Sequence, residues 1–266
     1  MKLGLIGCGF MGEAVLRAAL DKNVVRAADV RIAEASADRR AVIEQTLRIV
    51  PASDPGEAAA EADLIIFAVK PQEFEAAAGS VCGRTRAEQT VVSIMAGVRI
   101  DTIARATGHS AIVRVMPNTP AAIGEGMSAW MATPEVTDAG RDQVRALLAS
   151  LGREVSVTDE KYIDMATALS GSGPGFVYLL IEAFIDAGVQ IGFRRDVAEL
   201  LALQTFLGSA RYAAATGKHP AQLRNEVTSP AGTTAAGLLV LEQAGVRAAI
   251  AEAVEAAYAR ARELGG

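Results

Sequence analysis

Three glycines near the N-terminus have the spacing that lets a backbone wrap closely around a phosphate. The segment 7–12 reads GCGFMG and stands between an apolar run and a helical stretch. In such a turn the first glycine permits the tight bend, the second lets the backbone approach a pyrophosphate, and the third allows close packing of helix on strand. The amides and dipole of the following helix favour an anion. The turn therefore predicts a bound dinucleotide, and the expected cofactor contacts are Gly7, Gly9, Phe10, Met11 and Gly12.

Glu34 has the spacing from this turn at which a carboxylate usually binds the adenosine ribose. A carboxylate accepts a hydrogen bond from the 2′-hydroxyl and repels a 2′-phosphate, so Glu34 favours NADH. Ser36, Arg39 and Arg40 follow directly, and an arginine can bind a 2′-phosphate, which favours NADPH. The sequence thus predicts Glu34 and Ser36 as cofactor contacts, with NADPH or NADH as the cofactor.

Three further segments follow strand candidates and should lie at the carboxyl edge of a sheet, where α/β folds bind ligands. They are 68–72, 95–98 and 116–120, and their small residues and prolines give a rigid backbone beside a cofactor. Asn118 offers both a donor and an acceptor to a carboxamide, whereas Lys70 can equally be a surface lysine. The cofactor contacts expected here are Ala68, Val69, Lys70, Pro71, Ala96, Gly97 and Asn118.

A second polar turn lies far along the chain. The segment 228–234 reads TSPAGTT and stands just before a helix that should begin near Thr233. Hydroxyls and a glycine at a helix N-terminus form a cradle for an anion without any basic side chain. A plain N-cap is the alternative, but it needs fewer such groups. The turn therefore predicts a site for an anionic substrate group.

The first half of the chain alternates apolar strands with helical stretches. Several strand candidates are continuous apolar runs, which is typical of a parallel sheet buried on both faces. Such alternation indicates right-handed crossovers and a doubly wound sheet. The predicted fold class is therefore α/β, with a dinucleotide-binding Rossmann domain over residues 1–158. The expected strands are 3–6, 30–33, 64–69, 91–95, 111–115, 127–130 and 154–157, and the expected helices are 13–20, 37–46 and 137–151.

After residue 158 the strand pattern stops, and residues 159–266 are predicted to form an all-helical dimerisation and substrate-binding domain. The stretch 176–191 is apolar on nearly all sides, so it should be buried on more than one side. The next helix, which we expect Asp196 to cap, also spreads its apolar residues over more than one face. A partner subunit explains this pattern better than a compact monomeric domain, so we expect an obligate homodimer.

The composition argues against several function classes. The formal net charge is −5 and no basic tract is present, so a nucleic-acid partner is not expected. Two cysteines and two distant histidines provide neither a disulfide framework nor a zinc site, so we expect no metal. The N-terminus enters a strand without a signal peptide, and acidic residues interrupt the longest apolar run. We therefore expect a cytoplasmic protein without a membrane partner.

Together these motifs make the chain resemble the pyrroline-5-carboxylate reductase family over nearly its whole length. The blocks GCGFMG, AVKPQ, SIMAGV, RVMPNTP and SGSGPGFVY occur in the family's order. The family's C-terminal signature is matched by Pro220, Leu223, Val227, Thr228, Ser229, Gly232, Thr234, Gly237, Leu238, Leu241 and Glu242. Three positions depart from the usual pattern. Ala231 stands for a common glycine, Gly175 for a common alanine, and Glu34 for a polar or basic residue.

The resemblance implies a Rossmann domain, a helical dimerisation domain, often a higher assembly of dimers, and the last step of proline synthesis. In that step a hydride passes from NADPH or NADH to C5 of the cyclic imine pyrroline-5-carboxylate and gives L-proline. By resemblance Thr234 is the catalytic residue and donates a hydrogen bond toward the ring nitrogen. The implied substrate contacts are Ser229, Gly232, Thr233 and Thr234. A cyclic imine can enter already protonated, so no strong general acid is required.

Three alternatives use the same residues differently. A 3-hydroxyacid dehydrogenase shares the plan of a Rossmann domain followed by helices, but it needs a lysine on the helix after residue 175, where this chain has none. A dinucleotide sensor would not need the hydroxyl-rich turn. A paralogue that reduces a related cyclic imine, such as a six-membered ring, fits the same residues.

Overall fold

The structure, a computed structural model, describes residues 1–265 and divides into two compact units. The first unit comprises Met1–Ser172 together with the C-terminal residues from Ala257 onward. The second unit comprises Gly173–Ala256. The chain therefore passes between the units twice.

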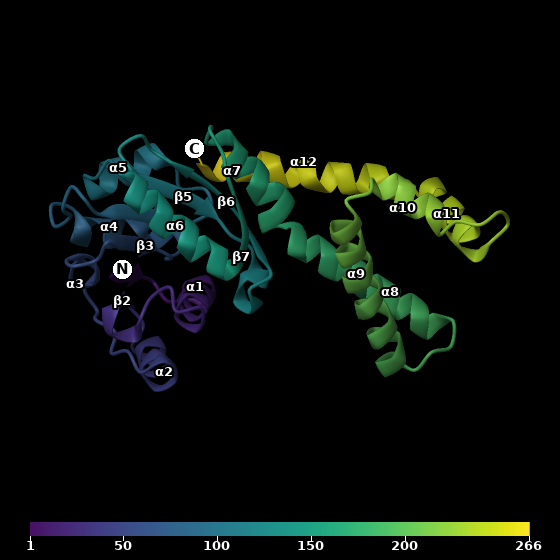
Figure 1. Cartoon of the computed structure of the whole chain (residues 1–266), viewed down its shortest axis with the longest axis horizontal. Coiled ribbons are helices and arrows are strands. Elements are labelled where there is room, and N and C mark those ends of the chain that lie inside the picture. The colour runs from purple at the N-terminus through teal and green to yellow at the C-terminus, as the bar shows by residue number, and fades with distance from the viewer. Residues whose placement is uncertain (266) are drawn as a thin grey trace. The chain divides into compact units, whose positions relative to one another are not determined.

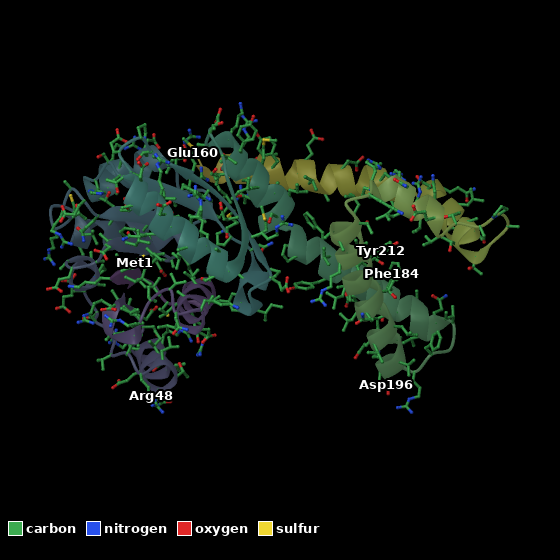
Figure 2. All side chains as sticks on the ribbon, viewed as in Figure 1. Met1, Arg48, Glu160, Phe184, Asp196 and Tyr212 are labelled. Atoms are coloured by element: carbon green, nitrogen blue, oxygen red, sulfur yellow. The ribbon has the colours of Figure 1, made fainter. Side chains whose placement is uncertain are left out.

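Helix α7 (Lys161–Ala166) lies beyond the boundary expected after residue 158, yet its contacts assign it to the first unit. Arg114 in the sheet is 1% exposed and binds Glu160 at 2.8 Å and Asp164 at 2.7 Å. Figure 2 labels Glu160, which stands just before the helix. These buried ion pairs hold α7 against the sheet.

Seven strands form one sheet in the order β2-β1-β3-β4-β5-β6-β7, so all seven predicted strands are present. The chain goes from β1 to β2 on one side and then to β3 on the other, which places a topological switch point between β1 and β3. The doubly wound prediction is therefore confirmed. The strands are β1 (Leu3–Ile6), β2 (Val30–Ala33), β3 (Leu64–Phe67), β4 (Thr90–Ser93), β5 (Ile112–Met116), β6 (Gly126–Ala132) and β7 (Gly152–Ser156).

Strand β6 departs from the expected parallel arrangement. It pairs antiparallel with β5, whereas the other neighbouring strands pair in parallel. Residues 117–125 alone join β5 to β6, and they contain a short 3₁₀ turn, Thr119–Ile123. A parallel crossover needs a dozen or more residues, so a connection this short makes the chain turn back.

Helices cover both faces of the sheet (Figure 1). On one face, apolar residues of α1, α2 and α6 join Leu3 and Leu5 in one core cluster. On the other face, α3, α4 and α5 pack with Ile6 in a second cluster. Successive residues of β1 thus point to opposite faces. The helices are α1 (Phe10–Asp21), α2 (Ala37–Leu47), α3 (Pro55–Ala59), α4 (Phe74–Val81), α5 (Ile100–Thr107) and α6 (Asp138–Leu151).

Trp130, the only tryptophan of the chain, lies in β6 and is 2% exposed. Its indole Nε1 donates to the carboxylate of Glu154 on β7. The guanidinium of Arg145 lies 5.7 Å from the ring centroid. The buried ring therefore keeps its polar edge hydrogen-bonded within the first unit.

The second unit consists of helices, as predicted. Phe184 of α8 and Phe206 of α9 meet edge to face with their ring centroids 5.0 Å apart, and Figure 2 labels Phe184. The predicted helix start near Thr233 is confirmed. The helices are α8 (Gly173–Gln190), α9 (Arg195–Thr216), α10 (Pro220–Glu226), α11 (Thr233–Gln243) and α12 (Val246–Gly265), and the last residues of α12 belong to the first unit.

The expectation that Asp196 caps α9 is wrong. The helix begins at Arg195 and its N-cap position is Arg194. Asp196 (Figure 2) lies in the first turn, where a carboxylate favours the helix dipole. Its Oδ2 accepts a hydrogen bond from Arg194 at 2.9 Å, so the carboxylate binds a side chain rather than a backbone amide.

Large apolar side chains of the second unit remain exposed in a single chain. Tyr178, Leu179 and Leu200 are 59%, 64% and 70% exposed. Helix α7, a π-helical turn (Thr167–Gly171) and α8 form one continuous helix, which is long and apolar enough to cross a membrane by length and composition alone. A helix that packs against a partner subunit has the same composition.

Candidate functional site

A cavity of about 790 Å³ lies at the switch point, beyond the carboxyl ends of β1, β2 and β3. Its wall combines the glycine turn, the residues that follow β2 and the segment that follows β3. Open α/β sheets bind their ligands at this place, and the volume suits a bound organic ligand. Seven predicted cofactor contacts line the cavity together: Gly7, Gly9, Glu34, Ser36, Ala68, Val69 and Lys70.

The glycine turn is shaped for close backbone packing and for a ligand. Gly7 has a φ of +85°, and a Cβ there would stand 2.7 Å from Cγ1 of Val69. A Cβ on Gly12 would stand 2.5 Å from the carbonyl oxygen of Gly7. A Cβ on Gly9, by contrast, would meet no atom of residues 1–265 within 4 Å. Since no side chain caps α1, its first amides and the free space at Gly9 fit a pyrophosphate.

Glu34, which directly follows β2, stabilises the glycine turn by hydrogen bonding. Its Oε2 accepts a hydrogen bond from the amide of Cys8 at 2.9 Å, and its Oε1 accepts one from the amide of Ser36 at 3.0 Å. The Ser36 hydroxyl caps α2 by accepting a hydrogen bond from the amide of Arg39 at 3.3 Å. The negative charge of Glu34 is therefore fixed in the cavity wall.

The two arginines that follow Glu34 are engaged within the protein. Arg39 Nε donates to the carbonyl oxygen of Cys8 at 2.7 Å, and its guanidinium also pairs with the carboxylate of Glu13 on α1. Arg40 Nη1 donates to the carbonyl oxygens of residues 34–35, both at 2.8 Å. A 2′-phosphate would have to compete with these contacts.

The ionisable groups beneath the turn keep defined charges at neutral pH. Burial raises the pKa of the Cys8 thiol to about 11, and the nearby charge of Arg39 lowers it only in part. Burial also raises the pKa of Glu13, but hydrogen bonds from Arg39 and Arg17 outweigh this effect and hold it below its ordinary value. The thiol is therefore protonated and a poor nucleophile, while Glu13 is ionised.

The other predicted cofactor contacts do not line this cavity: Phe10, Met11, Gly12, Pro71, Ala96, Gly97 and Asn118. Asn118 already has partners in the first unit. Its Nδ2 donates to the carbonyl and hydroxyl oxygens of Ser170, both at 3.2 Å, and its Oδ1 accepts from the amide of Met127 at 2.9 Å. A contact between Asn118 and a carboxamide therefore stays a prediction.

The cavity also includes residues that we did not predict as contacts. Arg39 lines it, as do Ser53, Pro55 at the start of α3, and several residues of α4. The segment before α3 reaches the cavity because Ala52 pairs with Ala33 at the end of β2. This pairing joins positions that are distant in sequence, so no local pattern indicates it.

The second polar turn lies between α10 and α11 in the second unit. The amide of Gly232 donates to the carbonyl oxygen of Ser229 at 3.1 Å and closes a β-turn with Pro230 and Ala231 at its centre. Proline fixes a negative φ and Ala231 has a φ of +57°, so the turn is of type II. Such a turn favours glycine where this chain has Ala231.

The predicted substrate contacts Ser229, Gly232, Thr233 and Thr234 come together at the start of α11. Gly232 is the N-cap, Thr233 is exposed and Thr234 is half-buried. No side chain caps this helix, so its first amides are available to an anion such as a carboxylate. The arrangement suits the expected substrate cradle, and the roles of the individual residues stay predictions.

Comparisons with known protein families match both parts of the chain. Residues 160–264 match the family described as pyrroline-5-carboxylate reductase dimerisation. Residues 2–97 match the family described as NADP oxidoreductase coenzyme F420-dependent. The first match covers the helical half, and the second covers the strands and the turn that build the cavity.

Full-length relatives agree with these matches. The pyrroline-5-carboxylate reductase of Synechocystis sp. is 41% identical over 100% of this chain and 98% of its own length. That of Pisum sativum is 38% identical over 98% and 95%. The solved structure of the Plasmodium falciparum pyrroline carboxylate reductase with NADP bound has a TM-score of 0.90 at 31% identity, covering 100% of this chain and 98% of that chain. The resemblance found in the motifs is thereby confirmed, and the chain belongs to the pyrroline-5-carboxylate reductase family.

Proposed function

We propose that this protein reduces pyrroline-5-carboxylate to L-proline with a nicotinamide cofactor, the last step of proline synthesis. The observation that carries the proposal is the family membership over the full chain, together with an intact hydroxyl-rich turn at Ser229–Thr234. When bound, the reduced nicotinamide supplies the hydride that adds to C5 of the imine. The protein must then bind, orient and hydrogen-bond the ring.

Thr234 is proposed to hydrogen-bond the ring nitrogen. As hydride adds to C5 of a protonated imine, the pair of electrons of the C=N bond becomes the lone pair of the nitrogen. The Thr234 hydroxyl can donate to that lone pair and stabilise it as it forms. The amides of Thr233 and Thr234, at the uncapped start of α11, are proposed to bind the substrate carboxylate.

The test of this role compares Thr234→Ala with Thr234→Ser. Loss of a single donor to the reacting group typically costs about 10²–10³-fold in turnover. We expect a fall of that order in Thr234→Ala, near-normal turnover in Thr234→Ser, and an unchanged Kd for the cofactor in both. Unchanged turnover in Thr234→Ala would remove Thr234 from the mechanism.

The substrate itself is tested by offering five- and six-membered cyclic imino acids to the same preparation. We expect oxidation of NADH or NADPH with the five-membered ring at the higher kcat/KM. A preference for the six-membered ring would favour the paralogue alternative. Cofactor binding without imine-dependent oxidation would favour a dinucleotide sensor.

We further propose that the enzyme prefers NADH to NADPH. The proposal rests on Glu34, whose carboxylate is held in the cavity wall by two backbone amides. It is therefore fixed near the position where a ribose 2′-group is expected, and it cannot easily move away from a phosphate. Arg39 and Arg40, the nearest candidates to bind that phosphate, already bind Glu13 and backbone carbonyls.

Glu34→Gln tests this preference because it removes the charge and keeps the size. The lost backbone hydrogen bond should weaken binding of both cofactors alike, so the informative quantity is the ratio of their Kd values. We expect the variant to shift this ratio toward NADPH by about 10-fold or more, as removal of one close like charge allows. Glu44→Gln, an exposed carboxylate on α2, is the control with the same change of charge. A wild-type preference for NADPH, or an unchanged ratio in Glu34→Gln, would contradict the proposal.

We also propose that the working form is a cytoplasmic homodimer built on the helical half, with the higher assembly of dimers that the family resemblance implies. The exposed apolar side chains of α8 and α9 support a dimer, since a single chain leaves them in contact with water. The mass in solution tests the assembly, and an active monomer would contradict it. Fractionation of cells that produce the protein tests the location and also any membrane association of the long helix Lys161–Gln190.

A further inference from the structure

The turn that follows β4 lies at the carboxyl edge of the sheet, where the proposed function requires the nicotinamide end of the cofactor. Residues 96–97 form this turn, and Gly97 has a φ of +75°. Both residues are predicted cofactor contacts, yet neither lines the cavity at the switch point. What holds this turn in place therefore matters for catalysis.

The last turn of α12 packs directly on Gly97. A Cβ on Gly97 would stand 2.9 Å from Cβ of Leu264, 3.0 Å from its carbonyl oxygen and 3.1 Å from its carbonyl carbon. A Cβ on Gly265 would stand 3.6 Å from the carbonyl oxygen of Gly97. These contacts involve backbone and Cβ atoms, whereas the Leu264 residue as a whole is 54% exposed. Glycine at position 97 therefore permits the positive φ and also leaves room for the close approach of α12.

The residues just after the turn are held by Glu160. Its Oε1 accepts a hydrogen bond from the amide of Ile100 at 2.8 Å, at the start of α5, and its Oε2 lies 3.5 Å from Nη2 of Arg99. Glu160 is itself bound by the buried Arg114. The end of α12 shares a second cavity with these groups, and Tyr258 lines it together with Arg99 and Glu160. Figure 1 shows the end of α12 beside α7.

Both passages of the chain between the two units thus attach to the same short segment. Glu160 precedes the long helix that leaves the first unit at Ser172, and Leu264 ends the helix that re-enters it at Ala257. The segment held between them, 96–100, follows the strand whose end should carry the nicotinamide. Movement of either helix end would move this segment.

We propose that the last turn of α12, Leu264–Gly265, is a positioning element of the reductase, which fixes the turn 96–97 for the cofactor through backbone contact with Gly97. Only the effect of this element on turnover depends on the proposed function. The contact itself concerns the cofactor-free protein and can be tested there.

The first experiment compares a chain ending at Glu263 with the full-length variant Leu264→Ala. The alanine keeps the backbone and Cβ atoms that meet Gly97, so this control should behave like the wild type. In the shortened chain we expect faster amide exchange of residues 96–99 without cofactor, and a fall in kcat/KM of about tenfold or more, as for other losses of reactant orientation. Dimer mass should be unchanged. Normal exchange and turnover in the shortened chain would overturn the proposal.

The second experiment introduces Gly97→Ala into both the full-length and the shortened chain. In the full-length chain the new Cβ meets Leu264 and also carries the cost of a positive φ. In the shortened chain only the second cost remains. We therefore expect Gly97→Ala to lower the Tm of the cofactor-free protein more in the full-length chain. Equal losses in both would show that Leu264 does not rest on Gly97.

These outcomes separate the inference from the proposed function. If the wild type fails to reduce pyrroline-5-carboxylate, exchange and thermal unfolding still decide whether α12 holds the turn. If exchange and unfolding change as expected while turnover does not, the contact is structural only and the positioning role is refuted.

Discussion

Replacing Arg114 with methionine should destabilise the first unit strongly, because the side chain lies inside the sheet between two carboxylates. Arg114 is 1% exposed, and its partners Glu160 and Asp164 are 15% and 8% exposed, at 2.8 and 2.7 Å. Methionine fills much of the same volume, but it leaves the buried Asp164 without its cation and leaves Glu160 with only the more exposed Arg99, 3.5 Å away. Removing one partner of a buried ion pair costs about 3–5 kcal/mol.

Such a loss is large enough to measure by thermal unfolding followed by circular dichroism. For a unit of this size it corresponds to a fall in Tm of about 6–20 °C. The matched control is Arg145→Met. Arg145 also faces two carboxylates, Asp142 at 3.2 Å and Glu154 at 3.7 Å, but its side chain is 52% exposed. Exposed pairs contribute about 0–1 kcal/mol, so the control should lose little.

A triple variant, Arg114→Met with Glu160→Gln and Asp164→Asn, tests the cause. If the cost comes from uncompensated charge, removing both carboxylates should restore a large part of the stability. If the cost comes from lost packing, the triple variant should be no better than the single one. The reasoning fails if Arg114→Met loses no more than Arg145→Met at equal protein concentration.

Three further predictions concern single positions. Gly9→Ala should leave thermal unfolding of the cofactor-free protein unchanged but raise the Kd of NADH about tenfold or more, because only the ligand needs the space at Gly9. Gly7→Ala should lower the Tm as well. Unchanged binding in Gly9→Ala would contradict a pyrophosphate at this turn. Iodoacetamide near pH 8 should alkylate the exposed Cys82 and not Cys8, because at a pKa of about 11 only about one Cys8 thiol in a thousand is ionised. Mass spectrometry of the native protein checks this, and rapid labelling of Cys8 would refute its burial. Ala231→Gly should raise the Tm slightly. Relief of the positive φ stabilises the folded state by about 1–2 kcal/mol, whereas the greater backbone entropy of glycine in the unfolded chain costs about 0.4–1 kcal/mol. A fall in Tm would contradict a strained turn.

The strands could be predicted because their signal is local. Runs such as Leu3–Ile6 and Val30–Ala33 are short, apolar and bounded by turns, and the structure has both with the predicted bounds. The direction of β6 was not predicted, because the alternation of strands and helices indicates a parallel sheet and residues 117–125 were not considered separately. The length of that connection, read against what a parallel crossover needs, would have predicted the reversal.

The site could be predicted only where its residues follow strands of the sheet. Gly7, Glu34 and Ala68 come directly after β1, β2 and β3, so topology alone brings them to one edge. Other contacts depend on the tertiary fold. Neither the approach of Leu264 to Gly97 nor the burial of Arg114 beside Glu160 has a local signal, since each joins segments that are distant in the chain.

The single buried tryptophan allows the first unit to be followed separately by fluorescence. Because Trp130 lies in β6, its emission reports on the first unit, while circular dichroism of the helices also records the second unit. Unfolding curves that coincide for the two signals would mean that both units melt together, and curves that separate would measure how independent they are. The emission of tryptophan also overlaps the absorption of a reduced nicotinamide, so quenching of Trp130 by energy transfer offers a direct titration of cofactor binding in every variant described above.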